Sequence, residues 1–200
     1  MKSVLVAYTT NSGSTEEVAK VIAEELGKDG AQVEVRRIEE VTNVEPYAAV
    51  VVGGPMILGW HRAAVGFVKK HQQALSRVRV AYFFTAMSLT QTNQESVGGV
   101  PVFVDPTLAK PPKNAKRLSL RERYATVSNY AGRPLKAAPL VKPVSIAIFG
   151  GRLEMFRLKL PQMLFVLLVI RAQLGDLRNW PAIRQWAAQV RTALAEKQQA

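Results

Sequence analysis

Short apolar runs alternate with amphipathic segments along most of the chain. Nearly continuous apolar runs predict buried strands, and a more polar run at 33–38 predicts a strand nearer the edge of a sheet. The predicted strands lie at residues 4–8, 33–38, 48–52, 78–84 and 144–149. Between the second and third of these, residues 39–47 form either a crossover turn or a short helix.

The segments between the strands have the residue spacing of helices. Ser14 and Glu17 fit the capping-box pattern S-x-x-E, so a helix is predicted to begin at Ser14. Further helices are predicted over 61–76, 118–131 and 181–197. Strands that alternate with helices favour an α/β fold, with a parallel sheet covered by helices on both faces. We expect one domain over residues 1–200.

Two segments interrupt this rhythm. Residues 89–117 contain four prolines and the pair Gly98-Gly99, which predicts a long irregular insertion with a short strand at Val100–Val104. The second segment is the apolar run "LPQMLFVLLVI" at 160–170, within a helix predicted at about 158–173. A membrane-spanning helix needs about 20 apolar residues, so this run is too short to cross a bilayer.

The apolar run leaves three interpretations open: a core helix, a helix at a membrane surface, or a contact with a partner. Arg152, Arg157, Lys159 and Arg171 bracket it, an arrangement typical of a helix lying in the interface of an anionic membrane. No export signal is visible, so we expect the protein in the cytoplasm, with the inner face of the membrane as an open alternative.

Composition removes several kinds of chemistry. The chain has no cysteine, which excludes disulfides, thiol catalysis and Cys-ligated metals. His61 and His71 are too few for an ordinary zinc site or a convincing catalytic triad. We therefore expect no metal site and name no catalytic residue. Redox chemistry in such a chain needs a bound cofactor.

The net positive charge lies entirely in the second half of the chain. Residues 1–104 are balanced, whereas residues 105–200 hold 17 Lys and Arg against 5 Asp and Glu, which accounts for the whole net charge of +12. This suggests an anionic partner, although the charge also serves solubility. Nucleic acid is the least favoured partner, because the basic stretches show no recognised motif and no interleaved aromatic residues.

A loop rich in hydroxyl groups joins the first strand to the first helix. Ligands of parallel sheets bind at the carboxyl ends of strands, and this loop can donate hydroxyl and backbone N–H groups to a phosphate there. Neither G-x-x-x-x-G-K-[ST] nor G-x-G-x-x-G is present. The alternative is an ordinary Ser/Thr-rich turn. The candidate phosphate-binding residues are Thr9, Thr10, Asn11, Ser12, Gly13, Ser14 and Thr15.

The segment "YTTNSGSTEEVA" resembles the phosphate-binding loop of flavodoxins, which matches at Tyr8, Thr10, Ser12, Gly13 and Thr15. Two later segments, "VVVGGPMILGWHRAAVGFVKKH" and "AYFFTAMSLTQTN", resemble the loops that flank the flavin ring. The resemblance implies FMN as cofactor and a flavodoxin-like doubly wound sheet of five parallel strands in the order 2-1-3-4-5. The implied ring-binding residues are Pro55, Met56, Ile57, Leu58, Gly59, Trp60, Ala86, Met87, Ser88 and Leu89. For Trp60 the alternative is packing of its loop onto the sheet.

Further segments, "PVSIAIFGGRLE" and "LGDLRNWPAIRQWA", are similar to the menaquinone-dependent protoporphyrinogen oxidase group of this family. That similarity implies an oxidoreductase passing electrons from an organic donor through FMN to a quinone-like acceptor. The alternative is an FMN electron carrier that docks on an acidic partner. A quinone or other small redox substrate, an anionic membrane surface and a second copy of the chain are the partners considered. The basic charge and the insertion at 89–117 depart from the family pattern.

Overall fold

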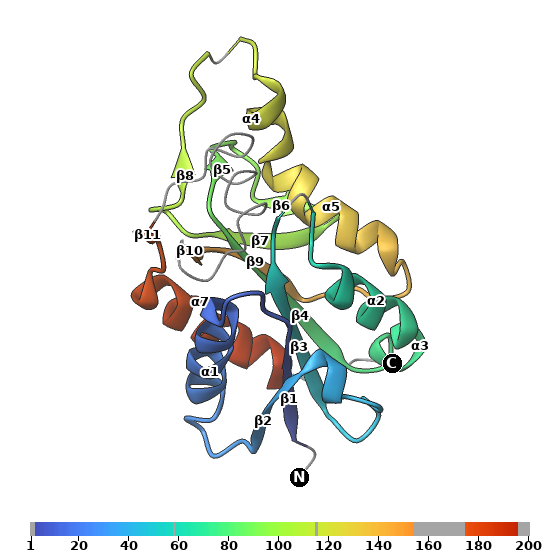
Figure 1. Cartoon of the computed structure of the whole chain (residues 1–200). Helices are drawn as coiled ribbons and strands as arrows, with labels where there is room; N and C mark the ends of the chain where they lie inside the picture. Colours follow the sequence, from blue (N-terminus) through green and yellow to red (C-terminus); the bar gives the residue numbers. More distant parts are fainter. Residues whose placement is uncertain (1–2, 58, 115, 154–174, 196–200) are drawn as a thin grey trace.

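The computed structural model describes residues 3–57, 59–114, 116–153 and 175–195. Its centre is a seven-stranded sheet in the order β2-β1-β3-β4-β9-β7-β6 (Figure 1). The strands are β1 (Val4–Tyr8), β2 (Val33–Arg37), β3 (Ala49–Pro55), β4 (Arg79–Ala86), β6 (Ser96–Val97), β7 (Val100–Val104) and β9 (Ser145–Gly150). Neighbouring strands are parallel except at β6–β7. The predicted order 2-1-3-4-5 is present as β2-β1-β3-β4-β9, in a flavodoxin-like arrangement.

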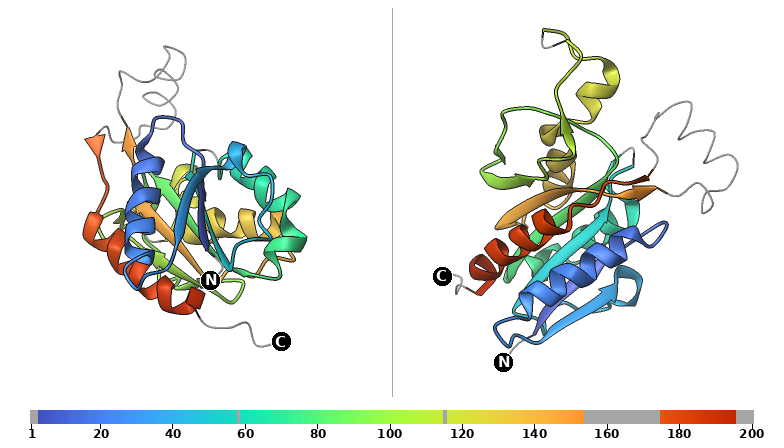
Figure 2. Two further views of the ribbon diagram at one scale, coloured as in Figure 1. Left: turned by 90° about the horizontal axis from the view of Figure 1, so that it is seen from below. Right: turned by 90° about the vertical axis from the view of Figure 1, so that its left-hand side faces the viewer.

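Helices cover both faces of the sheet, as predicted (Figure 2). They are α1 (Ser14–Leu26), α2 (Arg62–Lys70), α3 (Gln72–Leu75), α4 (Leu120–Tyr124), α5 (Val127–Ala137) and α7 (Trp180–Ala195), with a 3-10 turn at Ile38–Glu40 in the crossover before β3. One core lies between the sheet and α1 and α7, where Ile22 and Trp186 are buried. The other core lies under α2, α3 and α5 and contains Phe67 and Tyr130.

The insertion after β4 is more regular than predicted, and it adds to the sheet. The apolar, β-branched run Val100–Val104 pairs in parallel with β9 and forms a hairpin with β6, so the prediction of only five strands is wrong. Gly98 and Gly99 make the turn of that hairpin, with φ of 59° and 79°. Two adjacent residues with positive φ give the turn that follows the twist of a two-residue hairpin. Two further short strands, β5 (Leu89–Thr90) and β8 (Ala109–Lys110), pair beyond the sheet.

The helix predictions hold only in part, and the helix predicted over 61–76 is divided into α2 and α3 at His71. Helix α1 begins at Ser14, as predicted, but the predicted capping box is wrong, because the N-cap is Gly13, with φ of 91°, and no side chain caps the helix. The helix predicted over 118–131 is two helices, α4 and α5, because the chain leaves helical geometry at Ala125. A complete capping box occurs instead at Ser119 and Glu122.

The segment that follows β9 lies only partly within the described residues. Short strands β10 (Arg152–Leu153) and β11 (Gly175–Asp176) pair antiparallel on either side of it. The apolar helix predicted at about 158–173, with Arg157, Lys159 and Arg171, lies outside the described residues, as does Leu58. Within the described ranges, no helix has the length and apolar character needed to span a membrane.

Candidate functional site

Three loops meet at one edge of the sheet, the edge formed by the carboxyl ends of three neighbouring strands. β1, β3 and β4 are parallel and adjacent, so the loops after Tyr8, Pro55 and Ala86 start side by side. All predicted site residues within the described part of the chain belong to these loops or to the strand and helix ends beside them. The topology therefore brings together segments that are far apart in sequence.

The first loop is shaped to receive an anion. Gly13 adopts a left-handed conformation that favours glycine, and its N–H donates to Thr10 Oγ1 at 2.9 Å. Helix α1 begins at the next residue, and as its N-cap Gly13 offers no side chain to the first-turn N–H groups. These N–H groups and the helix dipole favour a negatively charged group at the loop.

The hydroxyl groups of the first loop divide into two sets. Thr15 is buried and its Oγ1 lies 2.9 Å from Thr85 Oγ1, which pins the start of α1 to β4. Thr9 is also buried, with Oγ1 3.4 Å from His61 Nδ1. Thr10 and Ser12 are only half-buried. Thr9 and Thr15 thus hold the loop in position, and Thr10 and Ser12 are the more exposed candidates for a ligand.

His61 joins the first loop to the second, a contact that the sequence did not reveal. It is the N-cap of α2, where Nδ1 accepts from the N–H of Ala63 at 3.3 Å. Burial lowers the pKa of His61, and the carboxylate of Glu39 opposes this only in part. The imidazole is thus held neutral at neutral pH, the form in which Nδ1 can accept the capping hydrogen bond.

This geometry predicts a pH-dependent stability. The folded pKa of His61 lies below its unfolded value of about 6.5, so the unfolded chain takes up the proton first as the pH falls. The free energy of unfolding should decrease below about pH 6.5. In His61→Asn, which keeps a capping side chain, urea denaturation should show a flatter pH dependence. Since His71 is unchanged in both proteins, parallel curves would contradict the assignment.

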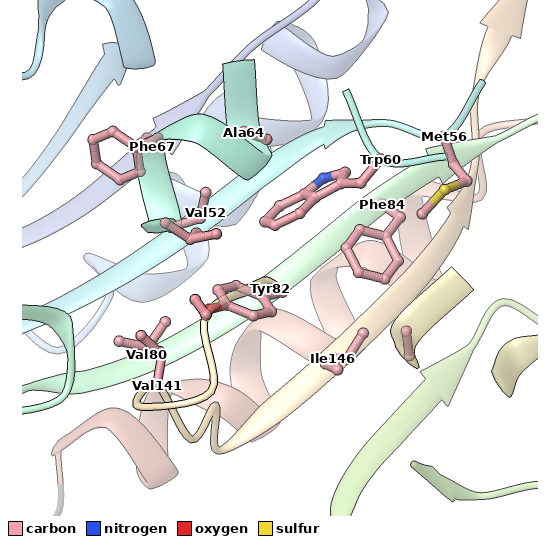
Figure 3. Close-up of a cluster of buried hydrophobic side chains, with 14 of the residues drawn as sticks. Val52, Met56, Trp60, Ala64, Phe67, Val80, Tyr82, Phe84, Val141 and Ile146 are labelled. Atoms are coloured by element: carbon pink, nitrogen blue, oxygen red, sulfur yellow. The ribbon is translucent and has the colours of Figure 1, made fainter. Parts of the chain in front are cut away.

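Trp60 in the second loop points into the core under α2 (Figure 3). Its ring centroid lies 5.1 Å from that of Tyr82 and 5.2 Å from that of Phe84, and the residue is 5% exposed. Its Nε1 has no hydrogen-bond partner among the described residues. In this conformation Trp60 packs its loop onto the sheet, the alternative considered from the sequence. Stacking on a flavin would require the indole to leave this position.

The third loop leads directly into the insertion. Met87 and Ser88 are half-buried, and the Ser88 carbonyl accepts a hydrogen bond from the Tyr130 hydroxyl at 3.1 Å. Burial raises the pKa of Tyr130 to about 12, so this hydroxyl remains a donor at neutral pH. Beyond the loop lies a hollow of about 540 Å³. It is lined by residues 89–95, Val102, Val104, Pro106, Ala109 and Val127.

Glu17 forms an ion-pair network that the capping-box interpretation missed. Its carboxylate accepts from Arg152 at 2.9 Å and from Arg178 at 2.6 Å, and Arg178 also pairs with Asp176. The Arg178 side chain is nearly fully buried, and its carboxylate partners raise its pKa. The network ties the first turn of α1 to β10 and β11. In the described part of the chain, no three His, Asp or Glu side chains gather as metal ligands.

Comparisons with known proteins agree with this geometry. The family model described as a flavodoxin domain matches residues 5–176. Protoporphyrinogen IX dehydrogenase (quinone) of Escherichia coli strain K12 is 33% identical over 82 residues, which is 40% of this chain and 45% of the relative's length. A flavodoxin from the domain Archaea has 10% identity and a TM-score of 0.51, over 97% of this chain and 99% of that one.

The rubredoxin oxygen:oxidoreductase of Desulfovibrio gigas has 12% identity and a TM-score of 0.50, over 97% of this chain and 36% of that one. At such identities the two structures show the fold alone. The family model, however, covers most of the sequence. The chain belongs to the flavodoxin domain family.

Proposed function

We propose that the protein is an FMN-dependent oxidoreductase that moves electrons from a reduced organic donor to a quinone-like acceptor. The cofactor is FMN, in keeping with the flavodoxin domain. FMN supplies the redox chemistry when bound, since a chain without cysteine offers no redox-active thiol. The protein contributes binding, orientation and exclusion of water.

The residues at the strand ends fit this cofactor. Thr10, Ser12 and the N–H groups at the start of α1 would bind the phosphate through neutral donors. Gly13, in the left-handed conformation and without a side chain, lets the phosphate come close to the backbone. Residues 55–60 and 86–89 would flank the ring. The indole N–H of Trp60 is buried without a hydrogen-bond partner among the described residues, which costs about 1–3 kcal/mol. Movement of the indole toward the flavin ring would relieve this cost.

The hollow beside the third loop is the observation that carries the enzyme proposal. A volume of about 540 Å³ suits a small organic molecule, since ligand pockets typically span about 300–1,000 Å³. Among its lining residues, Glu95 alone carries a charge, and the rest are apolar or carry amides and hydroxyls. Such a lining favours an uncharged molecule with carbonyl acceptors, such as a quinone head group.

The E. coli relative is named for the same chemistry, a protoporphyrinogen substrate and a quinone. This chain spans less than half of that relative's length, so both substrates are proposals here. The second candidate function is an FMN electron carrier docking on an acidic partner, which the net charge of +12 favours. A carrier needs no substrate pocket, so the two candidates differ at the hollow.

Anaerobic turnover of the FMN-loaded protein tests the proposal. Protoporphyrinogen IX should bleach the blue absorbance of the flavin, and menadione should restore it over many cycles. Ala109→Trp, which fills part of the hollow, should raise the KM for menadione about tenfold or more while FMN stays bound.

The matched control is Ala31→Trp, at another half-buried alanine, which lies just before β2 at the amino-terminal ends of the strands. It should leave the KM unchanged. A single reduction and reoxidation without sustained turnover would favour the carrier, and no bleaching by any organic donor would overturn the enzyme.

A further inference from the structure

The outermost part of the insertion is a charged projection at the same edge of the sheet as the three loops. We call residues 113–123, without 115, the insertion tip. In Figure 1 it rises beyond the ends of the central strands, from the segment after β8 into α4. It holds five basic residues (Lys113, Lys116, Arg117, Arg121 and Arg123) and one acidic residue, Glu122.

The one acidic residue, Glu122, forms its hydrogen bonds within the tip. The Glu122 carboxylate accepts from the backbone N–H groups of Lys113 and Ser119, both at 2.8 Å, and from the Ser119 hydroxyl at 2.7 Å. These donors lower the pKa of Glu122 to about 2, so it stays ionised and fastens the tip's two ends together. Within the described residues, no carboxylate forms an ion pair with Lys116, Arg117 or Arg123.

These three cations surround a hollow that also contains exposed apolar surface. The hollow measures about 430 Å³, and its remaining lining residues are Leu118, Ser119 and Leu120. Leu120 is 83% exposed, more than Ile57 or Leu140, the other exposed large apolar side chains of the described ranges. A leucine held in water among cations is the pairing expected where a protein meets phosphate head groups above acyl chains.

We propose that the insertion tip docks on the surface of an anionic phospholipid bilayer. Lys116, Arg117 and Arg123 bind lipid phosphates, and Leu120 enters the interface between head groups and acyl chains. The proposal does not rest on the proposed function, since it needs neither FMN nor turnover. It would also bring Ile57, 46% exposed in the second loop at the same edge, close to the membrane surface.

A bilayer is favoured over nucleic acid by the composition of the tip. Residues 108–123 contain no aromatic side chain, whereas single-stranded nucleic acid is bound largely by stacking bases on aromatic rings. An exposed leucine such as Leu120 also gains nothing from contact with a phosphate backbone. The tip is distinct from the apolar run at 160–170, which lies outside the described residues.

Co-sedimentation with lipid vesicles tests the proposal. The FMN-loaded protein should sediment with phosphatidylcholine vesicles containing phosphatidylglycerol, should be released by high salt, and should not sediment with phosphatidylcholine alone. The double variant Lys116→Glu/Arg117→Glu should weaken binding about 30-fold or more, and Leu120→Glu about tenfold. Both variants should retain stoichiometric FMN, which shows that they are folded.

Matched controls come from the opposite edge of the sheet. Leu140→Glu replaces an exposed leucine between α5 and β9, and Lys69→Glu/Lys70→Glu reverses two charges at the end of α2. Both should bind vesicles as the unaltered protein does. The proposal is overturned if the protein ignores anionic vesicles, if tip and control variants bind equally, or if the tip variants lose affinity only for a DNA or RNA probe. Loss confined to Leu167→Glu/Leu168→Glu would overturn it too, and would assign the contact to the apolar run.

Discussion

Ser12→Asp is expected to abolish FMN binding while leaving the fold intact. Ser12 lies half-buried in the first loop, immediately before the left-handed Gly13 and the start of α1. A carboxylate about 4 Å from the phosphate would repel it by about 4 kcal/mol at the effective dielectric constant of a protein surface. Affinity should fall about 1,000-fold, and the purified variant should be colourless.

Ser12→Asn is the matched control for this variant, because it has nearly the size of aspartate without its charge. It should lose affinity by about tenfold or less, as expected for one weakened neutral hydrogen bond. Fluorescence titration with FMN measures both constants, and the far-ultraviolet circular dichroism of the apoproteins checks the fold. Stoichiometric flavin in purified Ser12→Asp would show that the first loop does not bind the phosphate.

Gly150→Ala should have the largest effect on stability. Gly150 ends β9, and a Cβ there would lie 1.9 Å from the backbone oxygen of Leu177. Backbone cannot swing aside as a side-chain end can, and Leu177 is also held by its N–H bond to the Gly151 carbonyl at 2.9 Å. The substitution must displace the chain between β11 and α7, at a cost of about 3 kcal/mol in the free energy of unfolding.

Gly66→Ala provides the opposite result from the same chemical change. Gly66 lies within α2, and a Cβ there would meet nothing within 4 Å. Alanine should raise the free energy of unfolding by about 0.5–1 kcal/mol, since it has the higher helix propensity and restricts the unfolded chain. Urea denaturation compares the two variants. Equal stability of Gly150→Ala and the unaltered protein would mean that Leu177 does not cross the end of β9.

The features that could be predicted from sequence are those set by local pattern. The apolar run Val4–Tyr8 is β1 with the predicted bounds, and the strand order follows from the resemblance of the loops. The loops themselves were found because parallel strands place their carboxyl ends together. The hydroxyl-rich sequence after β1 therefore marks the candidate site from sequence alone.

The features that were missed depend on contacts between distant residues. Glu17 suits a capping box by spacing, yet Arg152 and Arg178 bind its carboxylate from the far end of the chain. The hydroxyls of Thr9 and Thr15 suit a phosphate by sequence, but His61 and Thr85 hold them within the protein. The sequence of the proline-rich insertion did not indicate that Val100–Val104 would pair with β9. Each of these choices is made by tertiary packing, which overrides local preference.

The position of β7 has a consequence for how the chain folds. Its parallel partner is β9, which comes later in the chain, and its other neighbour is the short β6 of its own hairpin. During synthesis β7 emerges before the edge that it needs, and it must wait until α4, α5 and β9 have followed. On its other side β7 has only the two-residue β6, so it pairs with a full strand on one side alone and its contacts should form late. Substitutions in β7 would then chiefly accelerate unfolding, and the insertion would be the first part of the sheet to detach and the last to return.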